Sequence, residues 1–460
     1  MLLAELRRRE PEPSPVLRRR AAGWCARNGL PEEALEYSIA AGDVDMAAAL
    51  VGKLGVPAYR QGRVDAVLRW LGWLEDRGGI EGHPMVAVLA GIVSTTAGRA
   101  AEAEQWAGVV DHWQYEEASG PDDPAAAGAW AAVLRAVLCQ HGVKQMRADA
   151  DEAARRFAAQ SVREPVAALM QGVARILSGD LDGGDACLRD AASVTDETGA
   201  PDVAAVALCE RSLVAMARGE WGKTQAFAQR ARTVLRQAGR QDHYATPLVC
   251  AVQARTALHR GDVSAARQEL VTAQRLRPLL TYALPHFAVQ ARIELARAHL
   301  ALSDPEGART LMREVDELLR RRPDLGNLTD EAAAFRTRLS AEHGPGVPGA
   351  SALTTAELRL LPMLAGHLSF PQIAAELFLS RHTVKSEPLS IYRKLRVCSR
   401  AQAVVRAREL GLLPGDDGLS SHRGDKAHQG MRCNDAQRRV EVYGPDSGVP
   451  GDVAQAGDDR

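Results

Sequence analysis

The stretch ARGEWGKTQAFA, residues 217–228, is one copy of a phrase that returns along most of the chain. Each copy has a small or basic residue, a glycine, a polar residue and then an alanine-rich segment. From Gly98 onward the phrase recurs about every 40 residues, a period typical of stacked helical hairpins. The other copies are AAGDVDMAAAL (40–50), RQGRVDAVLRWL (60–71), TAGRAAEAEQWA (96–107), LSGDLDGGDACL (177–188) and HRGDVSAARQEL (259–270), with weaker ones at 140–150 and 302–312.

One copy shows how such a hairpin is built. An apolar stripe before the glycine predicts a first helix. Gly219 tolerates the positive φ that the turn needs, and a second helix, from about Gly222 to Arg236, returns antiparallel. In the weak copy at 302–312, Asp304 stands where the glycine is expected. The side chains expected to face neighbouring helices are Val203, Val206, Ala207, Leu213, Met216, Ala226 and Ala231.

The repeated phrase predicts an all-α domain over residues 1–340. One hairpin cannot bury both of its faces, so consecutive units stack into a solenoid, here similar to tetratricopeptide (TPR) repeats. The concave face of such an array usually binds something. We expect a small-molecule or protein effector there, and the alternative is a plain scaffold and spacer.

Nothing in the sequence predicts an enzyme. Gly219 to Thr224 resembles a phosphate-binding loop, but the first glycine of that motif would fall at Ala217, and the segment matches the repeat turn. We find no nucleophile elbow, no metal-ligand spacing and no cofactor motif. The histidines of the repeat segments are expected to be surface or packed side chains: His243, His259, His286 and His299.

Bulk composition favours a cytoplasmic protein with one basic module. Seven cysteines are scattered without C-x-x-C spacing, which is typical of reduced thiols. The N-terminus lacks the apolar core of a signal peptide, and no run of apolar residues is long enough to span a membrane. The net charge is −1, yet residues 351–413 hold nine Lys and Arg against four Asp and Glu. Such local positive charge suits a phosphate-binding surface.

The basic module lies between two segments of low folding tendency. Residues 341–352 are rich in Gly and Pro and predict a flexible linker. Residues 414–460 have few apolar side chains and predict a disordered tail. The module itself is therefore assigned to residues 353–413.

Cap signals divide the module into four short helices. Each begins at a Ser or Thr, and three of these are followed three residues later by Glu or Gln, as in a capping box. The first helix is expected to end at Gly366, the second to cover about 370–377, and the fourth to end at Gly411. The caps are Thr354 with Glu357, Ser369 with Gln372, Ser380, and Ser399 with Gln402.

The second and third helices have the layout of a helix-turn-helix (HTH): a short helix, a tight turn and a basic helix. The third would begin at Arg381 and place its first residues in the major groove of double-stranded DNA. Lys385 and Ser386 are candidates to read base edges, because Lys can donate to guanine acceptors. Phosphate contacts, which give affinity and register, are expected from Ser380, Thr383, Tyr392, Lys394, Ser399 and Arg400.

The string LTTAE, followed by LAGHLSFPQIAAELFLSRHTVKSEPLSIYRKLRVCSRAQAV (364–404), resembles the DNA-binding domain of the LuxR family. The resemblance implies a four-helix HTH domain and a role in transcription regulation. It also implies that Lys385 faces the groove, with Thr383 and Val384 beside it. The second half of the last helix would help to form a homodimer on DNA.

The preceding region is similar to the helical repeats of the large, MalT-like LuxR regulators. RRRAAGWCARNGLPEEALEYSIAAGD (18–43) matches the usual start of that region. Those relatives carry an ATPase domain before it, and this chain resembles a member that lacks it. Control by a nucleotide is therefore not expected.

Two departures from the LuxR pattern leave an alternative open. The family favours a basic residue at the position of Ala356. More seriously, Pro388 falls inside the recognition helix and removes the hydrogen bond to the Val384 carbonyl, at a usual cost of about 3 kcal/mol or more. Glu387 adds an acidic group facing anionic DNA. The alternative is a helical-repeat interaction scaffold with a weakened or non-functional HTH.

Overall fold

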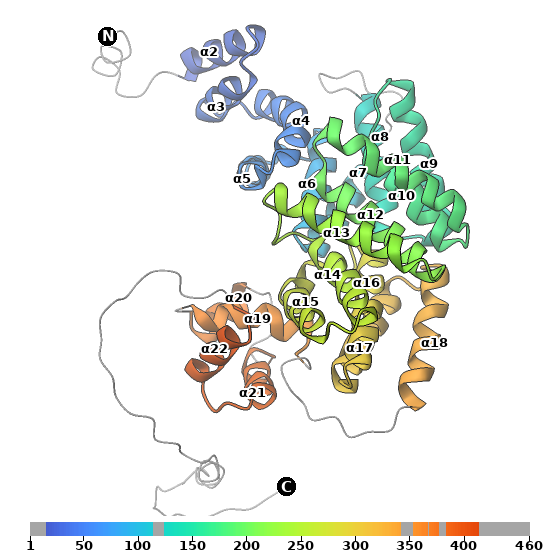
Figure 1. Ribbon diagram of the computed structural model, residues 1–460. Helices are drawn as coiled ribbons and strands as arrows, with labels where there is room; N and C mark the ends of the chain where they lie inside the picture. Colours follow the sequence, from blue (N-terminus) through green and yellow to red (C-terminus); the bar gives the residue numbers. More distant parts are fainter. Residues whose placement is uncertain (1–14, 114–123, 342–352, 367, 377–382, 414–460) are drawn as a thin grey trace, which may run out of the picture. The chain divides into compact units, whose positions relative to one another are not determined.

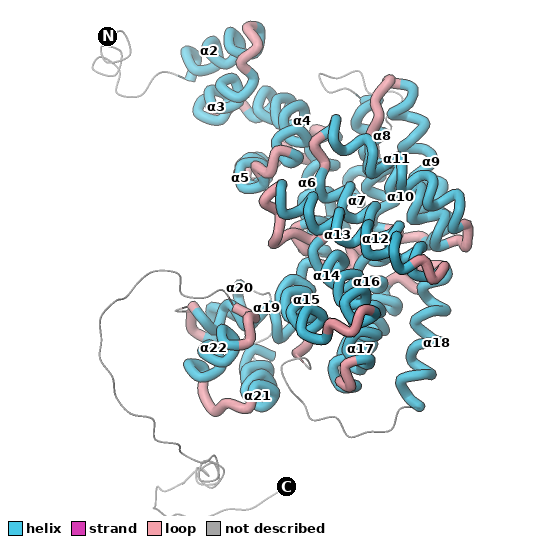
Figure 2. The backbone as a smooth tube through the Cα atoms, in the orientation of Figure 1, coloured by secondary structure: helices cyan, strands magenta, loops and turns pink. Residues whose placement is uncertain are grey.

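The computed structural model describes residues 15–113, 124–341, 353–366, 368–376 and 383–413. These residues contain helices and turns and no strand, so the predicted all-α class is confirmed (Figures 1 and 2). The expected linker, after Ala341, and the expected tail lie outside the described residues.

The helices fall into two sets, which we call the helical repeat (15–341) and the C-terminal module (353–413). The module contains α19 (Thr355–Ala365), α20 (Phe370–Glu376), α21 (Thr383–Leu395) and α22 (Arg400–Glu409). The repeat contains α2 (Pro15–Arg27), α3 (Pro31–Ala41), α4 (Val44–Arg60), α5 (Val64–Glu75), α6 (Pro84–Thr96), α7 (Ala100–Asp111), α8 (Pro124–Leu138), α9 (Gly142–Ala159), α10 (Pro165–Leu177), α11 (Leu181–Thr198), α12 (Pro201–Ala217), α13 (Trp221–Gln237), α14 (Thr246–His259), α15 (Val263–Leu276), the short 3₁₀ helix η1 (Arg277–Leu279), α16 (Pro285–Ala301), α17 (Pro305–Arg321) and α18 (Asn327–Ala341).

The repeat is a stack of helical hairpins. Consecutive helices pack together in pairs, such as α10 with α11, α12 with α13, α14 with α15 and α16 with α17. The first helices of successive pairs also pack on one another, α12 on α14 and α14 on α16 (Figure 1). The predicted architecture of stacked hairpins is therefore confirmed.

A glycine makes most of the turns, and in some copies an aspartate after it caps the next helix. In seven copies of the repeated phrase the first glycine has positive φ, from 69° at Gly42 to 91° at Gly179, where other residues are strained. Asp262 then caps α15 by accepting a hydrogen bond from the Ala265 amide at 2.9 Å. In the copy at 302–312 it is Ser303 (φ 59°) that takes the glycine position. The expected alignment on Asp304 was wrong by one residue, because Asp304 is the cap of α17.

The seam of the α12–α13 hairpin differs from the prediction at one position. Ala231 is fully buried, but Ala226 is exposed, and Ala228 is buried instead. Because an α-helix turns every 3.6 residues, Ala228, Ala231 and Leu235 share one face of α13, and Ala226 lies off it. The close approach of the helices therefore depends on Ala228 and Ala231.

The module has its own apolar core. Leu358, Leu361, Leu364, Ile373 and Ile391 are buried there with the ends of α21 and α22. The repeat has separate, larger cores, one between α2 and α8 and another between α8 and α18. The two regions nevertheless belong to one compact unit.

Candidate nucleic-acid interface

The first helix of the module begins at a complete capping box. The Thr354 hydroxyl accepts from the Glu357 amide at 3.3 Å, and the Glu357 carboxylate accepts from the Thr354 amide at 2.7 Å. Leu353 before the cap and Leu358 after it are both buried in the module's core, as in a hydrophobic staple. This reciprocal cap fixes where α19 starts and confirms the predicted helix boundary.

Lys394, a predicted phosphate contact, is turned into the module. Its ammonium group donates to both oxygens of Glu357, at 2.7 and 2.9 Å. The Lys394 side chain is 15% exposed and that of Glu357 is 5% exposed. The pair joins α21 to the N-terminus of α19, so Lys394 positions α21.

Arg400, another predicted phosphate contact, closes the opposite end of α19. Its guanidinium donates to the carbonyls of Met363, Leu364, Gly366 and Leu368 at 2.8 to 3.1 Å. These carbonyls lack partners within the helix, and a planar five-donor group can satisfy several of them at once. The same guanidinium lies over the Phe370 ring, 5.8 Å from its centroid. Arg400 therefore joins α19, α20 and α22.

The helix expected to enter the groove is α21. Thr383, Val384, Lys385 and Ser386 form its first turn, while Ser380 and Arg381 lie outside the described residues. Helix α20, which precedes it, ends at Glu376. A short helix followed by a basic helix is thus present in the predicted order, and the segment between them lies outside the described residues.

Pro388 does not interrupt α21. The helix runs from Thr383 to Leu395 with Pro388 inside it and the proline ring buried. Glu387, next to it, is half-buried, and its Oε2 atom has no hydrogen-bond partner among the described residues. Burial, and then the nearby charge of Glu357, raise the pKa of Glu387. Both residues are therefore tolerated by the fold, at the cost of one helical hydrogen bond and one unpaired carboxylate oxygen.

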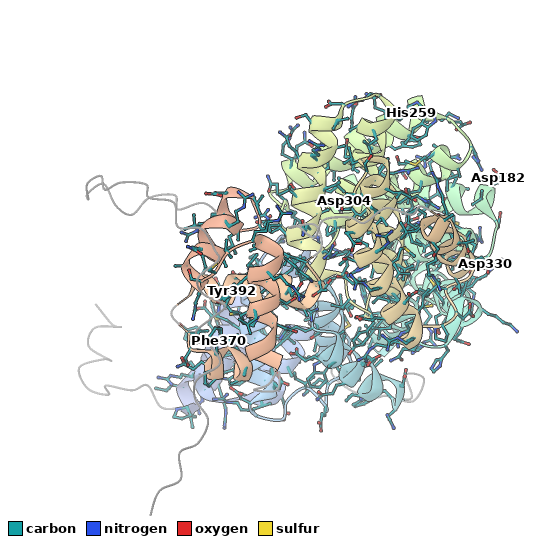
Figure 3. All side chains as sticks on the ribbon, turned by 90° about the horizontal axis from the view of Figure 1, so that it is seen from below. Asp182, His259, Asp304, Asp330, Phe370 and Tyr392 are labelled. Carbon is teal, nitrogen blue, oxygen red and sulfur yellow. The ribbon has the colours of Figure 1, made fainter. Side chains whose placement is uncertain are left out.

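The remaining predicted contacts are accessible to different degrees. Ser399 caps α22 by accepting from the Gln402 amide at 3.3 Å. Tyr392 is half-buried against the module's core, and burial raises its pKa. Figure 3 shows Tyr392 and Phe370 on the helices of the module. Two apolar side chains that sequence reasoning did not select are exposed here: Leu389 on α21 (67%) and Val405 on α22 (54%).

A polar cluster joins the module to the repeat. The Glu314 carboxylate on α17 accepts from the Thr355 amide at 2.7 Å and from the Thr355 hydroxyl at 2.8 Å. Arg292 on α16 donates to Glu314 at 2.8 Å, and the buried Arg277 donates to the Leu353 carbonyl at 2.5 Å. We call Arg277, Arg292, Glu314 and Thr355 the junction cluster.

Two guanidiniums of the junction cluster surround one carboxylate. Burial by itself would raise the pKa of Glu314, but the charges of Arg277 and Arg292 outweigh it and lower the pKa overall. Arg277 is 2% exposed, and burial lowers its pKa. A buried carboxylate that faces two guanidiniums and a hydroxyl has its hydrogen-bonding capacity filled. The start of the module is therefore held against the repeat by a buried carboxylate that keeps its charge and accepts from Thr355.

Of the four histidines named above, His286 and His299 are buried, His243 is half-buried and His259 is exposed, as expected for surface or packed side chains. His286 is 1% exposed, and burial lowers its pKa to about 3. His259, labelled in Figure 3, stacks on the Trp221 ring with centroids 3.8 Å apart. His299 lies 2.9 Å from the carboxylate of Asp304. Among the described residues no group of His, Cys, Asp or Glu is arranged to hold a metal ion.

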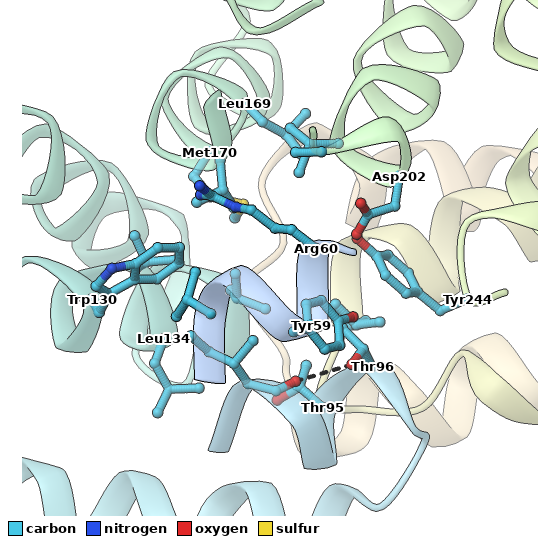
Figure 4. Close-up of a pocket in the computed structure, with 18 of the residues that line it drawn as sticks. Tyr59, Arg60, Thr95, Thr96, Trp130, Leu134, Leu169, Met170, Asp202 and Tyr244 are labelled. Carbon is cyan, nitrogen blue, oxygen red and sulfur yellow. Dashed lines mark hydrogen bonds between the residues drawn. The ribbon is translucent and has the colours of Figure 1, made fainter. Parts of the chain in front are cut away.

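One cavity of the repeat is apolar and small. Figure 4 shows it among Tyr59, Trp130, Leu169 and Tyr244, with Asp202 at one end. Its volume is about 90 Å³, below the roughly 150 Å³ of an apolar cavity known to hold benzene. The Tyr244 hydroxyl donates to the Asp202 carboxylate at 3.1 Å. The same carboxylate pairs with Arg240. As it stands, this cavity has no room for a ring-sized ligand.

The part of the chain that the structure describes contains no helix long and apolar enough to cross a membrane. A search of curated proteins finds no match.

Several solved structures of helical proteins resemble the chain. BtubC (BKLC) from P. vanneervenii has 14% identity and a TM-score of 0.23, covering 69% of this chain and 97% of that one. The human IFIT1 dimer with m7Gppp-AAAA has 12% identity and a TM-score of 0.33, covering 86% and 90%. Yeast Tom70 has 12% identity and a TM-score of 0.18, covering 71% and 96%. These TM-scores are too low to support an inference about function.

The C-terminal module gives the specific match. The family model described as bacterial regulatory proteins, luxR family, matches residues 351–407, which cover α19, α20, α21 and most of α22. The predicted resemblance of this module to LuxR-type DNA-binding domains is therefore supported, and with it a role in DNA binding and transcription regulation.

Proposed function

We propose that this protein is a DNA-binding transcriptional regulator that places α21 in the major groove. The match of residues 351–407 to the luxR family carries the proposal. It is supported by the capped ends of α19 and α22, which hold the helices of the module in place. We place its action in the cytoplasm, where bacterial DNA lies.

The first turn of α21 provides the base contacts in this proposal. Lys385 and Ser386 read base edges, with Thr383 and Val384 beside them. Ser380, Arg381, Tyr392 and Ser399 contact phosphates. Lys394 and Arg400 act differently from the sequence-based expectation: their internal hydrogen bonds make them positioning residues for α21 and α22.

The repeat serves as the region that receives a signal or a partner. The junction cluster supports this role, because Glu314 on α17 contacts the first residues of the module directly. A ligand that changes the packing of α16 or α17 would act on Thr355 through Arg292 and Glu314. We further propose a homodimer on DNA through α22, where Val405 is an exposed apolar side chain. Membership of the MalT-like group remains part of this proposal.

A titration of the full chain against duplex DNA at two salt concentrations tests the function. Binding should weaken steeply as salt rises, because phosphate contacts release counterions. Lys385→Ala should lower affinity for a preferred sequence by about 1–3 kcal/mol. Lys144→Ala, an exposed lysine of the repeat, is the control and should change nothing. Equal affinity of the Lys385 variant and wild type would remove this residue from base reading.

A second function is favoured by Pro388 and Glu387. If the missing hydrogen bond in α21 spoils docking, the protein is an interaction scaffold with a disabled HTH. Pro388→Ala adds an amide that can donate to the Val384 carbonyl. DNA binding by Pro388→Ala alone would support the scaffold, and equal binding by both proteins would support the regulator.

A further inference from the structure

A second cavity of the repeat is larger and is lined by both polar and apolar residues. It measures about 240 Å³ and lies among the first helices of successive hairpins, α10, α12, α14, α16 and α18, with Leu181 of α11. This volume exceeds the roughly 150 Å³ that accommodates benzene. Glu210 on α12 lies at its buried end, and we call it the Glu210 cavity.

Glu210 differs from the other charged groups of this cavity. Arg255 Nε and Glu294 Oε2 also lack a hydrogen bond in this cavity, but they form an ion pair with each other at 3.1 Å, whereas no ion pair is found for Glu210 among the described residues. Glu210 is 1% exposed, and its Oε2 atom accepts a hydrogen bond from the Gln290 side chain at 3.0 Å. Its Oε1 atom is buried and has no partner among the described residues. Burial raises the pKa of Glu210 to about 7, and the charge of Glu331 adds to the effect. A buried carboxylate oxygen without a donor is costly.

The other charged groups of the cavity compensate one another. Glu294 lies 3.1 Å from Arg255 and also pairs with Arg297. Arg297 pairs in addition with Glu331 at 2.6 Å. Two guanidiniums therefore serve the carboxylates of Glu294 and Glu331, and the carboxylate of Glu210 has only the Gln290 amide. The cavity lacks one positive charge at its buried end.

The wall next to Glu210 is apolar. Leu213, Val214 and Met216 on the same helix line the cavity, with Leu328 from α18. A ligand that fits must carry a cationic donor at one end and an apolar body at the other. No group of His, Cys, Asp or Glu among the described residues is arranged to hold a metal ion, and the carboxylates of Glu294 and Glu331 are paired with arginines.

We propose that the Glu210 cavity binds a small organic ammonium ion, whose N–H group donates to Oε1 of Glu210 and whose apolar body contacts Leu213, Val214 and Met216. An ammonium ion fills the open oxygen and supplies the missing charge. A neutral alcohol fills the oxygen only, and leaves a buried carboxylate unpaired. The site stands on these residues alone, whereas its role as the effector site of the regulator rests on the proposed function.

Calorimetric titration of the full chain without DNA tests the site. The probe is 2-phenylethylamine at pH 8, and its matched control is 2-phenylethanol, which replaces the ammonium by a hydroxyl. We expect the amine to bind at least about tenfold more tightly, a difference of about 1.4 kcal/mol. Equal affinity for the two probes would overturn the proposal, as would no amine binding at about 10 mM, beyond the millimolar range of weak ligands.

Two variants and a pH series assign the binding to Glu210. Glu210→Gln keeps the size of the side chain and should weaken amine binding at least about tenfold. Glu220→Gln, on the α12–α13 turn outside the cavity lining, should bind as wild type does. From pH 8 to pH 6 the affinity of wild type should fall about tenfold, because Glu210, with a pKa of about 7, takes up a proton.

Retained amine binding by Glu210→Gln, or an affinity independent of pH, would overturn the assignment. Thermal unfolding of each variant checks that the fold is kept. Because no DNA is present, a failure here leaves the DNA-binding proposal untouched, and a failure to bind DNA leaves the cavity testable.

Discussion

Glu210 and Glu314 are both buried glutamates on helices of the repeat, 1% and 7% exposed, yet their surroundings are opposite. Glu314 faces Arg277, Arg292 and the Thr355 hydroxyl, and its pKa is lowered. Glu210 has one amide donor, and its pKa is raised to about 7. Burial has the same sign in both places, so the difference comes from the neighbouring cations. The first site is complete and holds the module, while the second lacks a cation and suits a ligand.

The largest expected effect on the free energy of unfolding follows from removing the Glu314 carboxylate. Glu314→Ala would leave Arg277 and Arg292 buried without their carboxylate. Removing one partner of a buried ion pair costs about 3–5 kcal/mol, and urea unfolding should show that loss. Glu317→Ala, an exposed glutamate of the same helix, is the matched control. A loss below about 1 kcal/mol, as for a surface pair, would mean that the junction cluster does not stabilise the fold.

Removing the charge of Glu210 should instead raise the stability of the protein. The pKa of Glu210 is about 7 in the folded protein, against an ordinary 4.5. The folded state therefore binds a proton more tightly than the unfolded state, and stability present below about pH 4.5 is lost as pH rises through 7. Glu210→Gln cannot titrate at this position, so it lacks this pH-dependent loss of stability. Relative to wild type it should gain on the order of 2–3 kcal/mol between pH 5 and pH 8.

Urea unfolding of wild type and Glu210→Gln at both pH values measures this gain, since other titrating groups cancel in the difference. A difference that stays constant with pH would show that Glu210 titrates normally. The pKa values of the two buried glutamates would then not be shifted in opposite directions.

The smallest expected effect on the free energy of unfolding comes from removing the Thr355 hydroxyl at the junction cluster. Thr355→Val keeps the shape of the side chain but removes the hydroxyl that donates to Glu314 and accepts from Arg292 at 3.3 Å. Losing these bonds should cost about 1–2 kcal/mol of unfolding free energy. Thr337→Val, at an exposed position of α18, is the control. A neutral Thr355→Val would assign the whole strength of the junction to the charged groups.

The parts of the fold that depend on short spacings could be predicted from the sequence. The hairpin turns follow from glycines that need positive φ, and the caps of α19 and α22 follow from residue pairs three positions apart. Ala226 was misplaced because a small residue alone does not show which face of a helix it occupies. Ser303 was missed because a non-glycine residue can take the turn conformation.

The parts that depend on distant residues could not be predicted. Lys394 and Glu357 are 37 positions apart, and Glu314 and Thr355 are 41 apart. No short sequence pattern predicts which residues so far apart will form a pair. Basic residues near a recognition helix are reasonable phosphate contacts from sequence alone, but in the structure Lys394 and Arg400 donate to groups within the module. Glu210 gave no signal at all, because its missing partner is a property of the packed helices.

Selection of sequences from random duplex DNA by the purified full chain tests the central claim most directly. If the protein is a sequence-specific regulator, wild type should enrich one motif, with two related half-sites if it binds as a dimer. Pro388→Ala should enrich the same motif. Enrichment by Pro388→Ala with none by a folded wild type would contradict the claim, and would leave an interaction scaffold whose HTH no longer reads DNA.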